Sequence, residues 1–202
     1  HLIRVFNIAG EFKRSFGGQG ESAEQLHFPN DIRFGPDGLL YVVDTNNHRV
    51  GAFNRAGEHR FSIETTSSES SEGMVWPTRM AFAPDGTVFV INKGSGLVGG
   101  EIVRLEQKAG VIERIELPGR ADPMDLVVVD GNLWVTDEAG CEVLRYTLGG
   151  ERLENLETGE FEAMLAEIHF QRAYYQSMVS KAQAGLFALF VVLVGIYLVE
   201  RK

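Results

Sequence analysis

A β-rich unit of about 47 residues recurs along the first three quarters of the chain. The segment FPNDIRFGPDGLLYVVD at residues 28–44 returns as WPTRMAFAPDGTVFVIN at residues 76–92, and more loosely as DPMDLVVVDGNLWVTD at residues 122–137. The shared prolines of these segments, Pro29, Pro77 and Pro123, are 48 and 46 residues apart. A repeat of this length, built from short alternating runs, is typical of a β-propeller blade and not of a helical solenoid.

A second element completes the repeat. HLIRVFNIAGE at residues 1–11 matches HRVGAFNRAGE at residues 48–58, and related sequences follow at residues 102–110 and 143–151. Each unit therefore contains four short strands, with hairpin turns at sequences such as Pro36-Asp37-Gly38, because proline fixes φ and glycine tolerates a positive φ. The sequence predicts two outer strands before residue 17 and then three complete four-stranded units.

An open arc of blades leaves sheet edges and an apolar flank exposed, which favours aggregation. We therefore expect roughly 100 or more further residues before His1, or a second chain, to cover the arc.

The Pro-Asp-Gly turn, the YVVD sequence at residues 41–44 and the NHRV sequence at residues 47–50 resemble NHL repeats. The resemblance extends from His1 to about residue 156 and is strongest at residues 28–58. It implies a mainly β fold, an NHL-type β-propeller of which about 3.5 blades are present. Family members usually close a ring of about six blades.

Residues at matched positions of the repeat are expected to stabilise the fold. Tyr41, Phe89 and Trp134 are predicted to fill the space between neighbouring sheets. Asp44, Asn92 and Asp137 end the second strand of each unit and are predicted to cap turns and to pair with arginines such as Arg49.

The composition changes near residue 157, after which glycine, proline and aspartate become rare. We assign residues 1–157 to the propeller, 158–183 to an amphipathic juxtamembrane helix, 184–199 to a transmembrane helix and 200–202 to a short basic tail. The first of these helices is predicted from apolar residues spaced three or four apart.

The segment AGLFALFVVLVGIYLV at residues 184–199 has 16 consecutive residues without a charge. As a helix it is about 24 Å long, slightly shorter than a hydrocarbon core of about 30 Å, and a buried core helix is the alternative. Arg201 and Lys202 favour a cytoplasmic C-terminus, so a single-pass protein with its propeller on the periplasmic or extracellular side is expected. Ala184 and Ala188 form a small-residue pair suited to close helix packing.

The net charge of −9 disfavours nucleic acid as a partner. Cys141 is the only cysteine, so an internal disulfide and a thiolate metal site are excluded. No cofactor is predicted from the sequence.

Propeller lyases and hydrolases, to which the NHL resemblance extends, bind a metal in the central channel. Asp31 and Asp125 occupy equivalent positions, two residues after the proline of their units, where the middle unit has Arg79. These carboxylates either cap turns or, as the alternative, contribute to a metal site. A membrane-tethered, metal-dependent lyase or hydrolase, with most catalytic residues in further upstream blades, is therefore the second hypothesis for function.

The first hypothesis is a non-catalytic accessory or scaffolding subunit, anchored in the lipid bilayer and docked against other membrane-protein subunits. Predicted partner contacts are Asn46, Asn47 and Arg49 on a blade loop, with Phe161, Phe170, Tyr174 and Tyr175 on the juxtamembrane helix. Anchoring by one span raises the effective concentration of the propeller near its partners.

Overall fold

Alternating apolar runs bounded by proline and glycine form antiparallel strands throughout the repeats. The computed structural model describes residues 1–64, 74–94, 99–107 and 110–154, together with helical positions at 166, 170, 173–175, 177–178 and 180–181. The chain divides into two compact units, His1–Asn155 and Leu156–Lys202.

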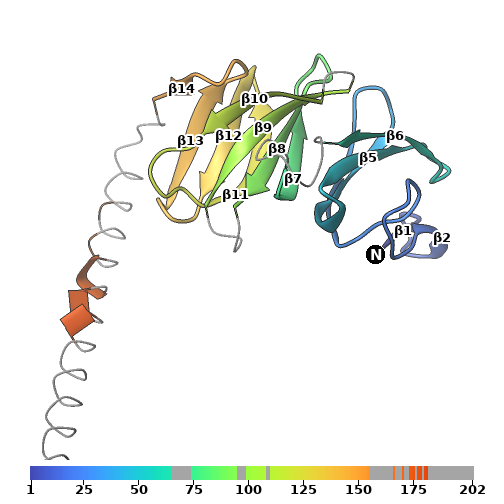
Figure 1. Cartoon of the computed structure of the whole chain (residues 1–202), viewed down its shortest axis with the longest axis horizontal. Helices are drawn as coiled ribbons and strands as arrows, with labels where there is room; N and C mark the ends of the chain where they lie inside the picture. Colours follow the sequence, from blue (N-terminus) through green and yellow to red (C-terminus); the bar gives the residue numbers. More distant parts are fainter. Residues whose placement is uncertain are drawn as a thin grey trace, which may run out of the picture. The chain divides into compact units, whose positions relative to one another are not determined.

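The described part of the first unit contains one two-stranded and three four-stranded antiparallel sheets (Figure 1). The half-blade consists of β1 (Leu2–Phe6) and β2 (Phe12–Gly17). Blade 1 contains β3 (Pro29–Phe34), β4 (Leu40–Asp44), β5 (Arg49–Phe53) and β6 (His59–Glu64), with the 3-10 helix η1 (Thr45–Asn47) between β4 and β5. Blade 2 contains β7 (Trp76–Phe82), β8 (Val88–Lys93), β9 (Gly100–Glu106) and β10 (Gly110–Glu116). Blade 3 contains β11 (Pro123–Val129), β12 (Asn132–Asp137), β13 (Glu142–Thr147) and β14 (Arg152–Leu153).

The first strand of each blade pairs with the second through the same irregular register. In blades 1, 2 and 3 the pairing shifts directly after Pro29, Pro77 and Pro123. A proline has no N–H to donate to a ladder, so a bulge beside it leaves no unpaired donor at that residue. The predicted two-plus-three arrangement of strands and the repeat register are confirmed.

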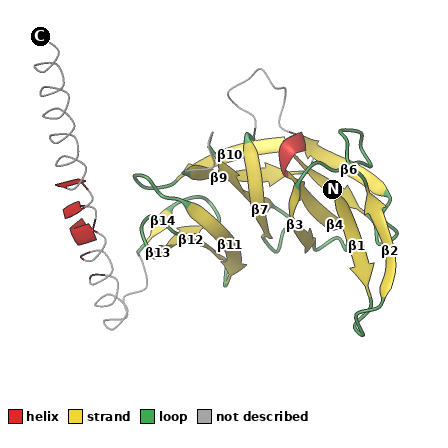
Figure 2. Cartoon of the chain, turned by 90° about the horizontal axis from the view of Figure 1, so that it is seen from below, coloured by secondary structure: helices red, strands yellow, loops and turns green. Residues whose placement is uncertain are grey.

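The blades follow one another in sequence order, with their first strands in contact. β3 contacts β7, and β7 contacts β11, so the three first strands line the inner side of the arc (Figure 2). Each blade runs outward from this strand in the order of the sequence. This is the arrangement of propeller blades around a channel.

Apolar side chains pack between consecutive sheets. Tyr41 of blade 1 packs in the core shared with blade 2, and Phe89 of blade 2 packs in the core shared with blade 3. Both rings are buried, so the prediction that these aromatics fill the space between sheets is confirmed for them. Burial of each such side chain contributes about 1.5–3 kcal/mol to folding.

Trp134, the third aromatic of this series, lies in a different environment. It is only partly buried and faces away from the core between blades 2 and 3, to which its neighbours Leu133 and Val135 belong. The guanidinium of Arg145 lies 4.6 Å from the centre of the indole ring. None of the described sheets packs on this flank of blade 3, so the role of Trp134 in filling a space between sheets stays a prediction.

The first strand of blade 1 also has an uncovered side. Ile32 and Phe34 pair with Val42 and Leu40 and share their face of the sheet, yet they are 47% and 62% exposed. The half-blade on that side supplies only β1 and β2, which pack on the outer part of the sheet through Ile3. The two side chains nearest the channel consequently remain open to solvent.

The described positions of the second unit are helical and exposed. Among the described residues, none of the helices combines the length and the apolar character that a bilayer crossing requires. The apolar segment at 184–199, with Ala184 and Ala188, lies outside the described residues, as does the basic tail. The predicted transmembrane helix therefore stays a prediction.

Candidate functional site

Each blade has two ends that differ in chemistry. We call the end that carries the connections at residues 44–48, 93–100 and 137–142 the loop end, and the end that carries the tight turns at residues 35–38, 83–86 and 130–131 the turn end. The sequence predicted partner and metal contacts at the loop end and along the channel.

At the loop end, a side chain at the close of each second strand caps the segment that leads into the blade. Asp44 accepts the N–H of His27 at 2.6 Å, and Asn92 accepts those of Val75 and Trp76 at 2.8 and 3.0 Å. Asp137 accepts the N–H of Asp122 at 2.7 Å. The predicted turn-capping role of Asp44, Asn92 and Asp137 is confirmed.

The predicted partner residues of this loop are tied into the same network. Arg49 is 5% exposed, pairs with Asp44 at 2.9 Å and donates to the carbonyls of Ser22 and Gln25. Asn47 donates to Asp44 at 2.7 Å and to the carbonyl of Gly20 at 2.9 Å. Arg49 is thus a buried structural residue, which corrects its placement on a contact surface.

Asn46 is partly buried, and its backbone N–H donates to the carbonyl of His27 at 3.0 Å. The role of Asn46 and Asn47 in binding a partner stays a prediction, although the Asn47 side-chain amide donates both of its hydrogen bonds within the loop network.

On the inner side of the arc, Arg33 connects the two candidate metal ligands. Its Nε lies 3.4 Å from Asp31 Oδ2, and its Nη2 lies 3.8 Å from Asp125 Oδ1. Asp31 also accepts the N–H of Met80 at 3.0 Å, which links blade 1 to the free edge of β7. The structure therefore brings Asp31 and Asp125 to one site, and a guanidinium lies where a cation would be needed.

Within the described ranges, no group of three or more His, Cys, Asp or Glu side chains is arranged to hold a metal ion. Arg79, the equivalent of Asp31 in blade 2, donates to the carbonyl of Asn30 at 3.2 Å. On the inner side of the arc, Asp31, Asp125, Arg33 and Arg79 thus contact one another or main-chain groups. Each of the two carboxylates already has a hydrogen-bonding partner.

At the turn end, the three tight turns surround an apolar hollow of about 430 Å³. Its walls combine aromatic, proline and aliphatic side chains with one carboxylate, and the residues are Phe34, Pro36, Phe82, Pro84, Val128 and Asp130, beside Gly35, Ala83 and Gly131. The volume lies in the range of about 300–1,000 Å³ that is usual for ligand pockets. All three blades contribute, so the hollow exists only when they stand side by side.

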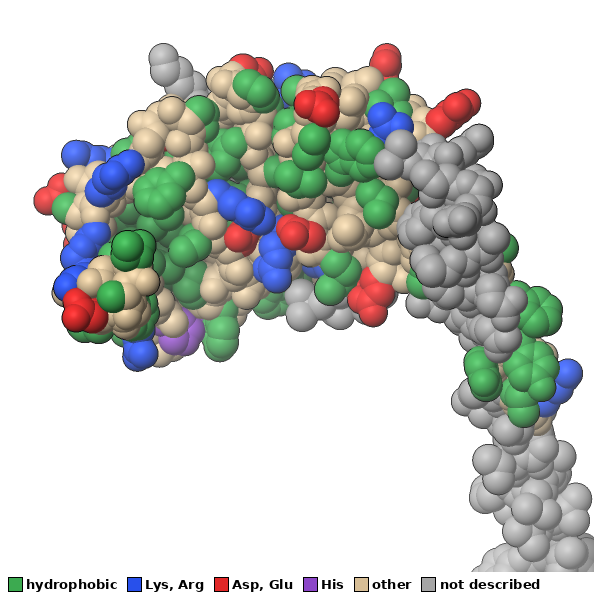
Figure 3. All heavy atoms as spheres, turned by 180° about the vertical axis from the view of Figure 1, so that it is seen from behind, with side chains coloured by type: hydrophobic (Ala, Val, Ile, Leu, Met, Phe, Trp, Pro, Cys, Tyr) green, Lys and Arg blue, Asp and Glu red, His purple; other side chains and the backbone are tan. Residues whose placement is uncertain are grey.

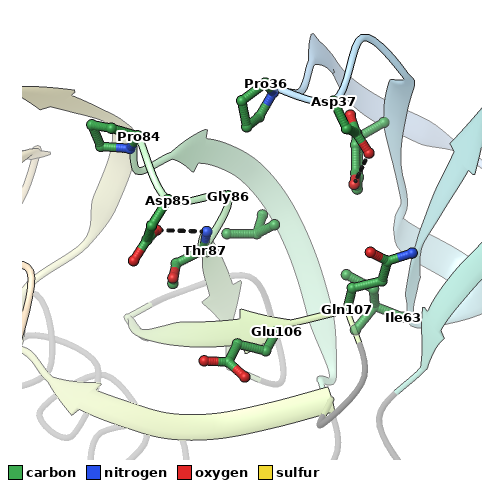
Figure 4. A pocket seen from close by; sticks show the side chains of 11 residues that line it. Pro36, Asp37, Ile63, Pro84, Asp85, Gly86, Thr87, Glu106 and Gln107 are labelled. Atoms are coloured by element: carbon green, nitrogen blue, oxygen red, sulfur yellow. Dashed lines mark hydrogen bonds between the residues drawn. The ribbon is translucent and has the colours of Figure 1, made fainter.

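A second cleft of about 520 Å³ lies between the turns of blades 1 and 2 (Figure 4). Asp37 and Asp85 face it from the two turns, and Glu106 faces it from the end of β9. Tyr41, Ile63 and Val88 supply apolar surface in the same cleft. The two hollows adjoin because Pro36 and Pro84 line both.

Hydrogen bonds hold the carboxylates of this cleft in place. Asp37 accepts the N–H of Leu39 at 3.0 Å and the hydroxyl of Tyr41 at 2.9 Å. Asp85 accepts the N–H of Thr87 at 2.9 Å, and this bond holds the pKa of Asp85 below its usual value. Burial, together with the bond to Asp37, raises the pKa of Tyr41 well above that of a free phenol. Asp85 is therefore ionised at neutral pH, and Tyr41 is a neutral donor.

Sequence reasoning assigned these turns only to hairpin formation. The repeated signal was an aromatic residue two positions before the turn proline, Phe34 before Pro36 and Phe82 before Pro84. The ring of Phe82 packs edge to face on Tyr41, beside the core between blades 1 and 2, and the convergence of three turns appears only in the folded blades.

In the second unit, Phe170, Tyr174 and Tyr175 are 64%, 53% and 61% exposed. The rings of Tyr174 and Tyr175 meet edge to face, with centroids 5.6 Å apart. Phe161 lies outside the described residues. Partner binding by this aromatic set stays a prediction.

Hydrophobic side chains also reach the surface of the blades, where they alternate with acidic and basic ones on the face shown in Figure 3. Those that are 43–51% exposed on β11 include Met124, Val127 and Val129. Scattered residues of this kind are normal for a protein surface, and a hollow lined by several of them is a better candidate for a site.

Residues 26–53 match the NHL repeat family. No curated protein sequence is detectably similar to the chain. Among solved structures, virginiamycin B lyase from Staphylococcus aureus is similar with a TM-score of 0.57 and 16% identity, over 78% of this chain and 49% of that chain. A catalytically inactive variant of that lyase with quinupristin is similar with a TM-score of 0.55 and 20% identity, over 75% and 47%.

Hydrazine synthase from Kuenenia stuttgartiensis is similar with a TM-score of 0.50 and 17% identity, over 71% of this chain and 39% of that chain. The chain thus spans about half the length, or less, of these structures. At such low identity the likeness shows the fold alone. Together with the sheet order and the matched repeat, it identifies residues 1–154 as part of a β-propeller that contains an NHL repeat.

Proposed function

We propose that the protein is a non-catalytic, membrane-anchored binding subunit. The propeller blades bind a protein partner, and the helix at residues 184–199 holds the protein in the bilayer among other membrane subunits. In this proposal the propeller lies on the periplasmic or extracellular side and the C-terminus in the cytoplasm.

The observation that supports binding over catalysis is that Asp31 and Asp125, on the inner side of the arc, are already engaged in hydrogen bonds and ion pairs. A general base or a metal ligand needs a lone pair that is open to the substrate or the ion. Asp31 instead accepts two backbone N–H groups and contacts Arg33, and Asp125 accepts the N–H of Leu126 and faces the same arginine. These contacts give Asp31, whose side chain is 13% exposed, a structural role, and they hold Oδ1 of the more exposed Asp125 against the same arginine.

The anchor is tested by membrane extraction. We expect the full chain to stay in the membrane fraction after a carbonate wash and to co-purify in detergent with a partner at fixed stoichiometry. A variant that ends at Gln183 lacks the apolar segment and should be released by the same wash. Release of the full chain by carbonate, or its purification without any partner, would contradict the proposal.

The orientation is tested by protease treatment of sealed cells or spheroplasts. A propeller on the outer side is accessible to added protease without lysis, so the intact chain is lost from an immunoblot of unlysed cells. Cleavage that begins only after lysis would reverse the proposed orientation.

A membrane-tethered, metal-dependent lyase or hydrolase is the second candidate, and it is favoured by the likeness to virginiamycin B lyase. If the protein is such an enzyme, the purified full chain consumes quinupristin or virginiamycin B, and EDTA stops the reaction. Consumption is measured by chromatography with mass detection. Turnover that is lost when Asp31 and Asp125 are both replaced by asparagine would favour this candidate over the first.

A further inference from the structure

We propose that the turn end of blades 1 to 3 is a peptide-binding surface whose partner carries an apolar side chain close to a lysine or arginine. The proposal rests on the proposed function, since it names the chemistry of the protein partner. It moves the contact surface from the loop end, where Arg49 is buried, to the opposite end of the blades.

The apolar half of the surface is the hollow among the three turns. Phe34 at its edge is 62% exposed, and Phe82 in its wall is half-buried. Rings and prolines bind with little loss of rotamer freedom, because they have few rotatable bonds. A leucine, methionine or aromatic side chain placed here covers the part of the Phe34 ring that remains exposed beside Arg55.

The charged half is the cleft beside it. Asp37, Asp85 and Glu106 line it, and among the residues that the structure describes no lysine or arginine does (Figure 4). Two described arginines lie in this region: Arg104 pairs with Glu113 at 2.9 Å and its charge also helps to lower the pKa of Asp85, and Arg55 lies 5.7 Å from the centre of the Phe34 ring. The cleft therefore favours a cationic side chain, and its apolar floor accommodates the methylene stem of lysine or arginine.

One partner segment can fill both halves. Pro36 and Pro84 form the boundary between the hollow and the cleft, so side chains that point to the same side of a bound segment can reach both. An extended peptide directs successive side chains to opposite sides, and alternate ones to the same side. A segment with an apolar and a basic residue two positions apart fits this arrangement.

The charge of the chain selects a peptide over other macromolecules. A net charge of −9 opposes binding to nucleic acid and to anionic lipid headgroups. A basic peptide is attracted by the same field, and its association rate should fall as salt screens the charges.

The test uses the full chain in detergent micelles and three labelled peptides in which every second residue is serine. The remaining positions, which share one side of an extended peptide, alternate leucine with lysine, leucine with glutamate, or serine with lysine. Fluorescence anisotropy gives the Kd of each. We expect the leucine–lysine peptide to bind at least about 10-fold more tightly than the other two, and to weaken as sodium chloride is raised from low to high concentration. Equal affinity for the glutamate peptide, or no binding of any peptide, overturns the proposal.

Matched variants locate the site. Glu106→Gln removes an exposed charge from the cleft, and Glu24→Gln removes one from an exposed loop at the other end of the blades. We expect the first to weaken binding of the leucine–lysine peptide by about 3-fold and the second to leave it unchanged.

For the apolar half, Phe34→Ser is compared with Phe12→Ser; Phe12 lies on the half-blade and is 56% exposed, against 62% for Phe34. A loss of about 10-fold is expected only for Phe34→Ser. Equal losses of affinity for the two variants of either pair would overturn the proposed location of the site. The salt dependence is measured on the unmodified protein, so it tests the charge attraction even if a variant fails to fold.

The two proposals fail separately. If the peptide binds as expected but the protein is released by carbonate or lacks a fixed partner, the binding surface stands and the membrane-subunit function does not. If the protein is anchored with a partner but none of the peptides binds, the function stands and this surface is wrong.

Discussion

Nε of Arg49 lies 2.9 Å from Oδ2 of Asp44, and both side chains are buried within blade 1. The same carboxylate accepts the N–H of His27 and the amide of Asn47, so one aspartate fixes a strand end, a 3-10 helix and the segment that leads into the blade. Such a pair is stable only while all of its hydrogen bonds are present, because each charge has been removed from water.

Asp44→Ala should therefore lower the free energy of unfolding by about 3–5 kcal/mol, since it leaves the Arg49 guanidinium buried without its counter-charge. Asn46→Ala, at a partly buried position in the same loop, should change it by less than about 0.5 kcal/mol. Urea denaturation followed by circular dichroism measures both. Similar effects of the two substitutions would show that the network does not stabilise the blade.

Two equivalent turn glycines make a matched pair. Gly57 and Gly10 have φ values of +87° and +80°, but a Cβ at Gly57 would lie 2.5 Å from the ring of Phe16, whereas at Gly10 nothing lies within 4 Å. Gly10→Ala should cost about 1–2 kcal/mol from left-handed backbone strain alone. Gly57→Ala should cost about 1–3 kcal/mol more from overpacking.

Thermal or urea denaturation of the two variants gives the comparison. A smaller loss for Gly57→Ala than for Gly10→Ala would mean that Phe16 does not pack against the turn of blade 1.

Asn92→Asp tests the capping amide of blade 2. Nδ2 of Asn92 donates to Glu101 at 2.8 Å, so the substitution places two carboxylates in contact and should cost about 1–3 kcal/mol at neutral pH. The repulsion raises the pKa of one of the two carboxyl groups, and protonation then restores a hydrogen bond. The loss of stability should consequently shrink as the pH falls from 7 toward 5. Urea denaturation of both proteins at the two pH values measures it. A loss of stability that grows on acidification would contradict the contact between Asn92 and Glu101.

The raised pKa of Tyr41 predicts that the stability of the fold decreases at alkaline pH. Because its pKa is raised above 10 in the folded chain, the stability it contributes is full below pH 10 and is lost as the pH rises above that value. Tyr41→Phe loses the bond to Asp37, at a cost of about 0.5–1.5 kcal/mol below pH 10. The difference between the two proteins should narrow at higher pH, since the variant has no phenol to ionise.

Tyr146, whose pKa is also raised by burial, is present in both proteins and cancels in this comparison. Denaturation between pH 9 and about pH 12 provides the measurement. A gap that is constant across this range would show that Tyr41 ionises equally easily in the folded and unfolded chains.

The blades could be predicted in detail from the sequence because their signals are local. Proline at the start of β3 and glycine at position 38 act through their own backbone angles, and the alternation in Leu40–Asp44 acts through the two-residue period of a strand. Repetition of these signals at a fixed spacing defined the blade, and the capping role of Asp44 followed from its place at the end of a strand.

The remaining features depend on contacts between distant residues. Whether Arg49 points to a partner or into a blade depends on the loop at residues 18–28, whose carbonyls it meets only in the folded chain. Arg33 reaches Asp125 because three first strands converge, and Trp134 is only partly buried because no described sheet packs on its flank of blade 3. Strand periodicity and turn chemistry are properties of neighbouring residues, so the sequence by itself determined the blades. Burial, charge pairing and the hollow at the turn end arise where surfaces of different blades meet, so only the tertiary structure decided them.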